Sequence, residues 1–223
     1  MNFFGHAWVA LRDESNRGPV RAEFVLGAML PDFASMLRTR PPSVSQSALQ
    51  AGIAFHHLTD EAFHGARSFL EFSRHASRFL SERGLSRGSA RAVAHVGVEL
   101  LLDAAFGAEP SANEAYLSAI GSGLTREVAS HIHWQDEDGE ARFRQLCHNL
   151  ERRGAFVSDA PASLTAERLR YILADRPRLA MDDAGQSVVR EWIETARPAI
   201  VSGAAALLSE VEHRIANRNS LER

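Results

Sequence analysis

The chain has 223 residues, enough for one domain that buries roughly 70% of its extended-chain surface. A hydrophobic share of 45% and a charged share of 24% are typical of globular proteins and exclude a disordered or fibrous chain. The net charge of −3 and the lack of a long basic run argue against nucleic-acid binding. Because Cys147 is the one cysteine, an internal disulfide and a cysteine-rich zinc site are excluded, and any metal must be bound by His, Asp or Glu.

The first residues, MNFFGHAWVALRDE, lack the basic start and the small-residue cleavage site of a signal peptide. No apolar run reaches the roughly 20 residues that span a bilayer. We therefore expect a cytoplasmic protein without a membrane span.

Helices are expected in the first half of the chain wherever apolar residues recur at helical spacing. Asn2 can cap a helix that ends near Asp13, and a second helix is expected over 20–29, where Pro31 stops it or starts a new turn. A loop follows over 38–47, which is rich in proline and serine. Three longer helices are then expected over 48–66, 68–83 and 86–106, and Gly84 and Gly107 close the last two.

The second half predicts shorter helices and one long one. The expected ranges are 113–120, 126–133, 140–153, 165–174 and 188–218, the last with a kink or break at Pro198. No alternating run suggests a sheet, so the pattern favours an all-α, single-domain helical bundle. Residues 1–107 would carry the site and 108–223 would close the core, and the alternative role of the last helix is a homodimer surface.

Two polar stripes fall on the expected helices 48–66 and 86–106. His56, Asp60 and His64 are each four residues apart, and His95, Glu99 and Asp103 repeat that spacing. Four residues advance a helix by about 400°, so each trio lies along one face. Because the second helix is apolar nearly all round, its carboxylates would be buried, which costs several kcal/mol unless they are paired or bind a cation.

These stripes predict a divalent metal site between the two helices. A single ion with ligands at about 2.0–2.2 Å cannot reach all of one stripe, whose ends are about 12 Å apart, so either two ions share the site or the outer residues only support it. Manganese, iron and zinc all accept mixed imidazole and carboxylate ligands. The alternative is that each residue is a hydrogen-bonded core side chain or is paired with an arginine.

The N-terminal half resembles the bacterial acyl-carrier-protein phosphodiesterases, distant relatives of the HD-type metal phosphohydrolases. MNFFGHAWVA is similar to the family's opening MNFLAHLYLA, GAMLPDF to its segment ending in Gly-Asp-Phe, and residues 52–60 to its GIxLHRxID element. Residues 99–104 are similar to its Asp-Val-x-x-Asp-His element, with Glu99 and Ala104 as departures. His64 falls where the family has Thr-Asp-x-His-Pro.

The resemblance implies a metal-dependent phosphoester hydrolase of HD-like fold, acting on a small phosphoester or a phosphopantetheinyl protein. It adds His6 and Asp32 to the site, so that the expected metal ligands are His6, Asp32, His56, Asp60, Glu99 and Asp103. The expected catalytic residues are His64 and His95, as extra ligands or general acids, together with Asp60.

Two alternatives remain open. GAMLPD is also similar to the Gly-Ala-x-x-Pro-Asp segment of zinc-dependent phospholipase-C-like proteins, and a catalytically silent metal-binding or protein-binding domain could keep both stripes for stability. No phosphate-binding glycine loop and no nucleophile elbow are found. We expect His131, His133 and Trp134 to have surface or packing roles, and Cys147 to be a packing residue.

Overall fold

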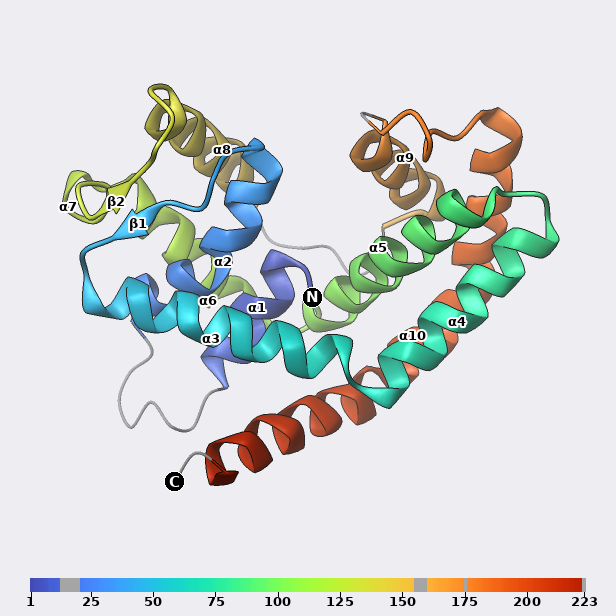
Figure 1. The fold of residues 1–223 in the computed structure, drawn as a ribbon, viewed down its shortest axis with the longest axis horizontal. Coiled ribbons are helices and arrows are strands. Elements are labelled where there is room, and N and C mark those ends of the chain that lie inside the picture. The colour runs from blue at the N-terminus through green and yellow to red at the C-terminus, as the bar shows by residue number, and fades with distance from the viewer. Residues whose placement is uncertain (13–20, 155–159, 175, 222–223) are drawn as a thin grey trace. The chain divides into compact units, whose positions relative to one another are not determined.

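The computed structural model describes residues 1–12, 21–154, 160–174 and 176–221 (Figure 1). These residues form α-helices and one pair of two-residue strands, which confirms the all-α class. Within the described ranges, no helix combines the length and the apolarity that crossing a bilayer requires.

The elements follow the chain as shown in Figure 1. They are α1 (Phe3–Leu11), α2 (Ala22–Leu37), β1 (Ser43–Val44), α3 (Ser47–His64), α4 (Arg67–Glu82), α5 (Arg87–Phe106), α6 (Pro110–Leu124), α7 (Arg126–Ala129), β2 (Ile132–His133), α8 (Gly139–Arg153), α9 (Ala162–Leu173) and α10 (Asp183–Leu221).

The chain divides into two compact units, each made of two separate stretches of sequence. Unit 1 comprises Met1–Glu61 and Phe106–Phe156, and unit 2 comprises Ala62–Ala105 and Val157–Arg223. The chain passes between the units near the C-terminal end of α3 and again at the end of α5, and the third boundary, at 156–157, lies outside the described residues. The expectation of a single domain stays a prediction, because two compact units can belong to one domain or to two.

In unit 1, α1 is the central element of an aromatic core. Every residue from Phe3 to Ala10 is buried, and the Asn2 side chain accepts a hydrogen bond from the Phe3 amide at the helix start. The Phe3 ring lies 5.5 Å from Phe33 of α2, and the Phe4 ring meets Tyr116 of α6 edge-on at 5.4 Å. Burying such a ring contributes about 1.5–3 kcal/mol, so this core fixes α1 between α2 and α6.

Helices α2 and α3 cross with their backbones in contact. A Cβ atom added to Gly52 would lie 2.2 Å from the Phe24 carbonyl oxygen, and one added to Gly27 would lie 2.4 Å from the Leu49 carbonyl oxygen. Only glycine allows so close an approach. This crossing brings the α2 backbone within reach of the α3 side chains that form the site described below.

In unit 2, α10 packs along α4 and against α9. Val211 of α10 and Leu80 of α4 are fully buried. The Glu210 carboxylate accepts hydrogen bonds from the amide and the hydroxyl of Ser68, in the first turn of α4. A carboxylate at this end of a helix satisfies free amides and interacts favourably with the helix dipole.

The structure differs from the expected elements at Pro31 and at one helix. Pro31 lies inside α2 and does not end it. Pro198 lies inside α10 and does not break it, and the kink expected there stays a prediction. The expected helix 126–133 is only α7, followed by β2, which pairs antiparallel with β1 and places Val44 opposite Ile132. The expected ends at Asp13 and Val20 lie outside the described residues.

Candidate metal centres

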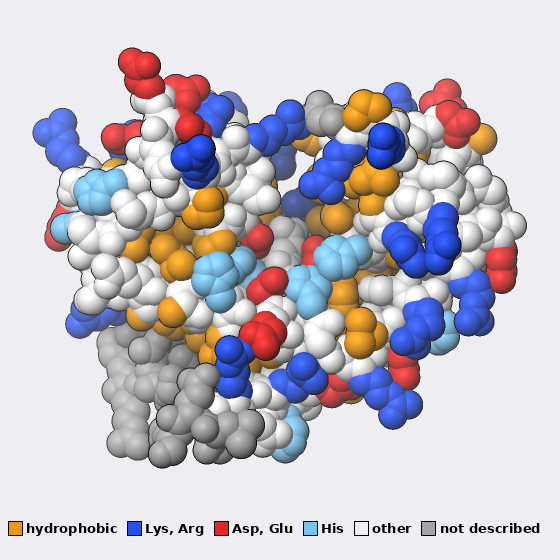
Figure 2. Space-filling view, viewed as in Figure 1, with side chains coloured by type: hydrophobic (Ala, Val, Ile, Leu, Met, Phe, Trp, Pro, Cys, Tyr) orange, Lys and Arg blue, Asp and Glu red, His pale blue; other side chains and the backbone are white. Residues whose placement is uncertain are grey.

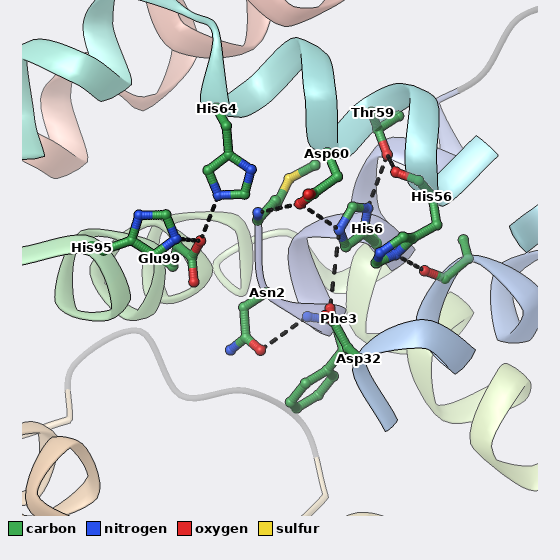
Figure 3. Close-up of polar contacts among 12 residues, drawn as sticks. Asn2, Phe3, His6, Asp32, His56, Thr59, Asp60, His64, His95 and Glu99 are labelled. Atoms are coloured by element: carbon green, nitrogen blue, oxygen red, sulfur yellow. Dashed lines mark hydrogen bonds and ion pairs between the residues drawn. The ribbon is translucent and has the colours of Figure 1, made fainter. Parts of the chain in front are cut away.

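The first group of metal-ligand side chains lies in unit 1. His6 comes from α1, and His56 and Asp60 come from α3, with one donor atom of each within 4.8 Å of the others (Figure 3). Asp32 of α2 lies beside them, with its Oδ2 atom 4.0 Å from His6 Nε2. Three helices therefore bring together four of the expected ligands.

The hydrogen bonds of Thr59 determine which nitrogen of His6 carries the proton. The Thr59 hydroxyl lies 2.9 Å from the Phe55 carbonyl oxygen and 3.0 Å from that of His56, so it donates its proton to the backbone. Its oxygen, 2.9 Å from His6 Nδ1, must then accept a hydrogen bond from that nitrogen. In a neutral ring, Nε2 of His6 is thus left with a free lone pair.

His56 is held in the same way by the backbone of α2. Its Nδ1 atom lies 2.9 Å from the Ala28 carbonyl oxygen, which can only accept, so Nδ1 carries the proton and Nε2 does not. Metal-binding histidines usually donate their other ring N–H to a carbonyl, carboxylate or water, which fixes the tautomer and the ring orientation. Both imidazoles of this group have that support.

Burial keeps both imidazoles neutral. His6 is completely buried, and loss of hydration lowers its pKa to about 3, although the nearby Asp60 carboxylate acts in the opposite direction. Burial also lowers the pKa of His56, against a smaller raising effect of its bond to Ala28. Neutral imidazole is the form that binds metal, so neither ring needs to lose a proton near pH 7.

The lone pair of His6 faces carboxylate oxygens rather than hydrogen-bond donors. Nε2 lies 3.6 Å from Asp60 Oδ1, too far for a hydrogen bond, and makes no hydrogen bond within the described residues. Two donor atoms bound tetrahedrally at about 2.1 Å from one ion lie about 3.4 Å apart, so the spacing suits a shared cation. Asp60 Oδ1 also forms an ion pair of 2.9 Å with the terminal amine of Met1, which supplies one positive charge.

We expect Thr59→Val to weaken metal binding by about 10- to 100-fold, because valine removes the acceptor that holds the His6 tautomer while keeping the side-chain shape. Thr59→Ser keeps the hydroxyl and should restore the affinity. Competition with a chromogenic chelator measures both constants. Equal affinities for the valine and serine variants would show that Thr59 does not orient His6.

The second group, in unit 2, is more open to solvent. Nε2 of His64 lies 3.1 Å and Nε2 of His95 lies 3.3 Å from the same oxygen, Oε1 of Glu99 (Figure 3). The two imidazole rings stack at 4.8 Å, and their side chains are 29% and 48% exposed. Burial raises the pKa of Glu99, but the hydrogen bond and charge of His64 and the charge of His95 outweigh it, and the net direction is down. Glu99 is thus an ionised potential ligand.

The expected ligands therefore fall into two groups in different units. Asp103 lies one turn beyond Glu99 on α5 and is buried, but it belongs to neither group.

Cys147 is buried in α8, and burial raises its pKa to about 12, consistent with a packing role. His133 lies in β2 and His131 directly before it, with Nδ1 of His131 2.9 Å from Ser45 Oγ.

The sequence did not single out three groups that support the first site: the Thr59 hydroxyl, the Ala28 carbonyl and the Met1 amine. Thr59 could have been identified from the sequence as a supporting residue, because it lies three residues after His56 on the same helix and hence on nearly the same face. The other two depend on which helices cross, and no local pattern indicates that.

Comparisons of the chain with family models, with curated proteins and with solved structures found no match.

Proposed function

We propose that the chain is a metal-dependent phosphoester hydrolase whose divalent ion is bound in unit 1 by His6, His56 and Asp60, with Asp32 beside them. One observation carries the proposal. Both buried imidazoles donate Nδ1–H to fixed acceptors and so direct their Nε2 lone pairs away from those acceptors. This is the support that metal-binding histidines have, and in His6 it leaves a buried Nε2 that makes no hydrogen bond within the described residues.

The burial of the ligands supports a catalytic rather than a closed structural site. His6 and His56 are buried, whereas the side chains of Asp60 and Asp32 are 37% and 26% exposed. The imidazoles thus lie on the protein side of the site and the carboxylates on the solvent side, where a catalytic ion would keep its open coordination position. A bound divalent ion lowers the pKa of water towards neutrality and polarises a phosphoryl oxygen.

The phosphoester substrate class rests on the likeness of MNFFGHAWVA and GAMLPDF to the acyl-carrier-protein phosphodiesterases. A small phosphoester or a phosphopantetheinyl protein is the substrate that this likeness favours, and a zinc phospholipase-C-like activity uses the same bond chemistry. Manganese, iron and zinc all suit the donor set.

A second candidate function is a catalytically silent metal-binding domain. The ion pair between Asp60 and the Met1 amine favours it, because Asp60, the carboxylate expected to act in catalysis, is already paired with an ammonium group. Turnover separates the two candidates, since a silent domain would bind metal without hydrolysing esters.

Hydrolysis of p-nitrophenyl phosphate and bis(p-nitrophenyl) phosphate tests the proposal. Protein stripped with chelator should be inactive, and addition of Mn²⁺ or Zn²⁺ should restore release of p-nitrophenol. Asp32→Asn should lower that rate by about 10- to 100-fold, because the amide no longer supplies a negative charge beside the ion. Asp138→Asn, at an exposed aspartate in the same unit, is the matched control and should keep full activity. Stoichiometric metal without turnover of either ester would establish the silent domain.

A further inference from the structure

A basic groove lies between α4 and α5, entirely within unit 2. Its volume is about 430 Å³, and its charged lining consists of Arg74 and Arg78 of α4 and Arg87 and Arg91 of α5. His95, whose Nε2 lies 3.3 Å from Glu99 Oε1, also lines it. Three serines of α4 complete the lining, which contains no acidic residue. Figure 2 shows blue basic side chains gathered over the part of the molecule where α4 and α5 lie in Figure 1.

The spacing of the four arginines causes like-charge repulsion along both helices. Arg74 and Arg78 are four residues apart on α4, as are Arg87 and Arg91 on α5, and like charges at this spacing repel each other along a helix. Among the residues that the structure describes, none of the four forms an ion pair, whereas Arg83 in the same unit pairs with Glu191. In a chain of net charge −3, these four exposed cations concentrate positive charge at one groove, where a bound anion would offset their repulsion.

The course of α5 extends this positive charge along the groove. Arg87, Arg91 and His95 follow each other at intervals of four residues, so their side chains line one face of α5 over about 12 Å. Basic side chains thus follow the α5 side of the groove over this length.

We propose that the groove binds a linear oligophosphate, a small molecule that carries at least three consecutive phosphate groups. A single phosphate group carries only about −1.5 to −2 at pH 7 and cannot neutralise four guanidinium groups. Guanidinium binds phosphate oxygens in bidentate fashion, and an oligophosphate offers such oxygens in a row. The volume is that of a small-molecule site, and the chain lacks the long basic stripe of a nucleic-acid surface. This binding site is separate from the proposed metal centre of unit 1 and does not depend on hydrolysis there.

Calorimetric titration of the full chain with tripolyphosphate, in buffer containing EDTA, tests the groove without metal or turnover. We expect tripolyphosphate to bind at least about tenfold more tightly than orthophosphate, with an affinity that falls as salt is added. The variant Arg78→Gln, Arg91→Gln should lose about tenfold in affinity. The control Arg190→Gln, Arg214→Gln removes the same charge from exposed positions of α10 and should change the affinity less than twofold.

The groove variant should melt no lower than the wild type, because it relieves a like-charge repulsion on each helix. If it nevertheless fails to fold, Arg74→Gln, Arg87→Gln removes one charge from each of the same pairs and carries the same expectation. Equal losses of tripolyphosphate affinity in the groove and control variants would show that only the net charge of the protein matters, and would overturn the site. Orthophosphate binding as tightly as tripolyphosphate would also overturn it. A single-stranded oligonucleotide is the third ligand to test. If it binds more tightly than tripolyphosphate and the groove variant no longer binds it, the ligand of the groove is nucleic acid and the oligophosphate proposal is overturned.

Discussion

Replacing Gly52 with alanine is expected to lower the free energy of unfolding by about 1–3 kcal/mol. The added methyl would lie 2.2 Å from the Phe24 carbonyl oxygen and 2.8 Å from the Cα atom of Gly27. All its close neighbours are backbone atoms, so no side chain can rotate away and α2 must separate from α3. Because whole domains are stable by only about 5–15 kcal/mol, urea unfolding followed by circular dichroism will resolve this loss.

Gly121→Ala is the matched control in the same unit. A methyl on Gly121 of α6 would have no neighbour within 4 Å, so only the higher helix propensity of alanine acts, and we expect a gain of about 0.5–1 kcal/mol. Gly52→Ala should also weaken metal binding, since separation of the helices draws the Ala28 carbonyl away from His56 Nδ1. A Gly52→Ala protein as stable as the wild type would show that α2 and α3 do not need this contact.

The three central helices could be predicted from local pattern alone. The ranges expected from apolar spacing and glycine stops, 48–66, 68–83 and 86–106, match α3, α4 and α5 to within two residues at each end. Gly84, at a φ of 98°, closes α4 as expected, because glycine adopts a left-handed conformation without steric cost. In these segments local preference and tertiary packing agree.

Local pattern was misleading where tertiary packing overrides it. Pro31 removes one backbone hydrogen bond from α2, yet the helix continues, with the flanking residues Leu30 and Phe33 fully buried. The pairing of Val44 with Ile132 could not be predicted from the sequence. It joins two strands of two residues each, which are too short to show an alternation of apolar and polar residues.

The site residues could be predicted only in part, because tertiary packing decides which helices face one another. Spacing by four shows that His56 and Asp60 share a face, but it does not show which helix lies opposite that face. Spacing alone also placed His64 on the same stripe as His56, whereas the structure groups His64 with His95 and Glu99. The division between the two groups follows from how the helices pack, and this depends on contacts distant in sequence.

The double substitution His56→Ala, Asp60→Ala is expected to remove the metal from unit 1, with a loss of affinity of at least about 100-fold. Both ligands on α3 disappear, and His6 cannot hold the ion with Asp32 alone. The helices should persist in far-ultraviolet circular dichroism. Leaving the buried Ala28 carbonyl without its partner costs only about 1–3 kcal/mol, within the stability of a typical domain.

His57→Ala, Glu61→Ala is the matched control, because it removes a histidine and an acid at the same spacing from the exposed face of the same helix. Elemental analysis after dialysis should show wild-type metal in this control and one equivalent less in the His56, Asp60 variant. Any metal that remains in the His56, Asp60 variant should be lost when Glu99→Gln is added. Glu99 is the carboxylate of the second group, and its Oε1 atom lies close to both His64 and His95. Full metal content in the His56, Asp60 variant would rule out the unit 1 centre. The buried imidazoles of unit 1 would then be explained by their hydrogen bonds, and Asp60 by its ion pair with Met1.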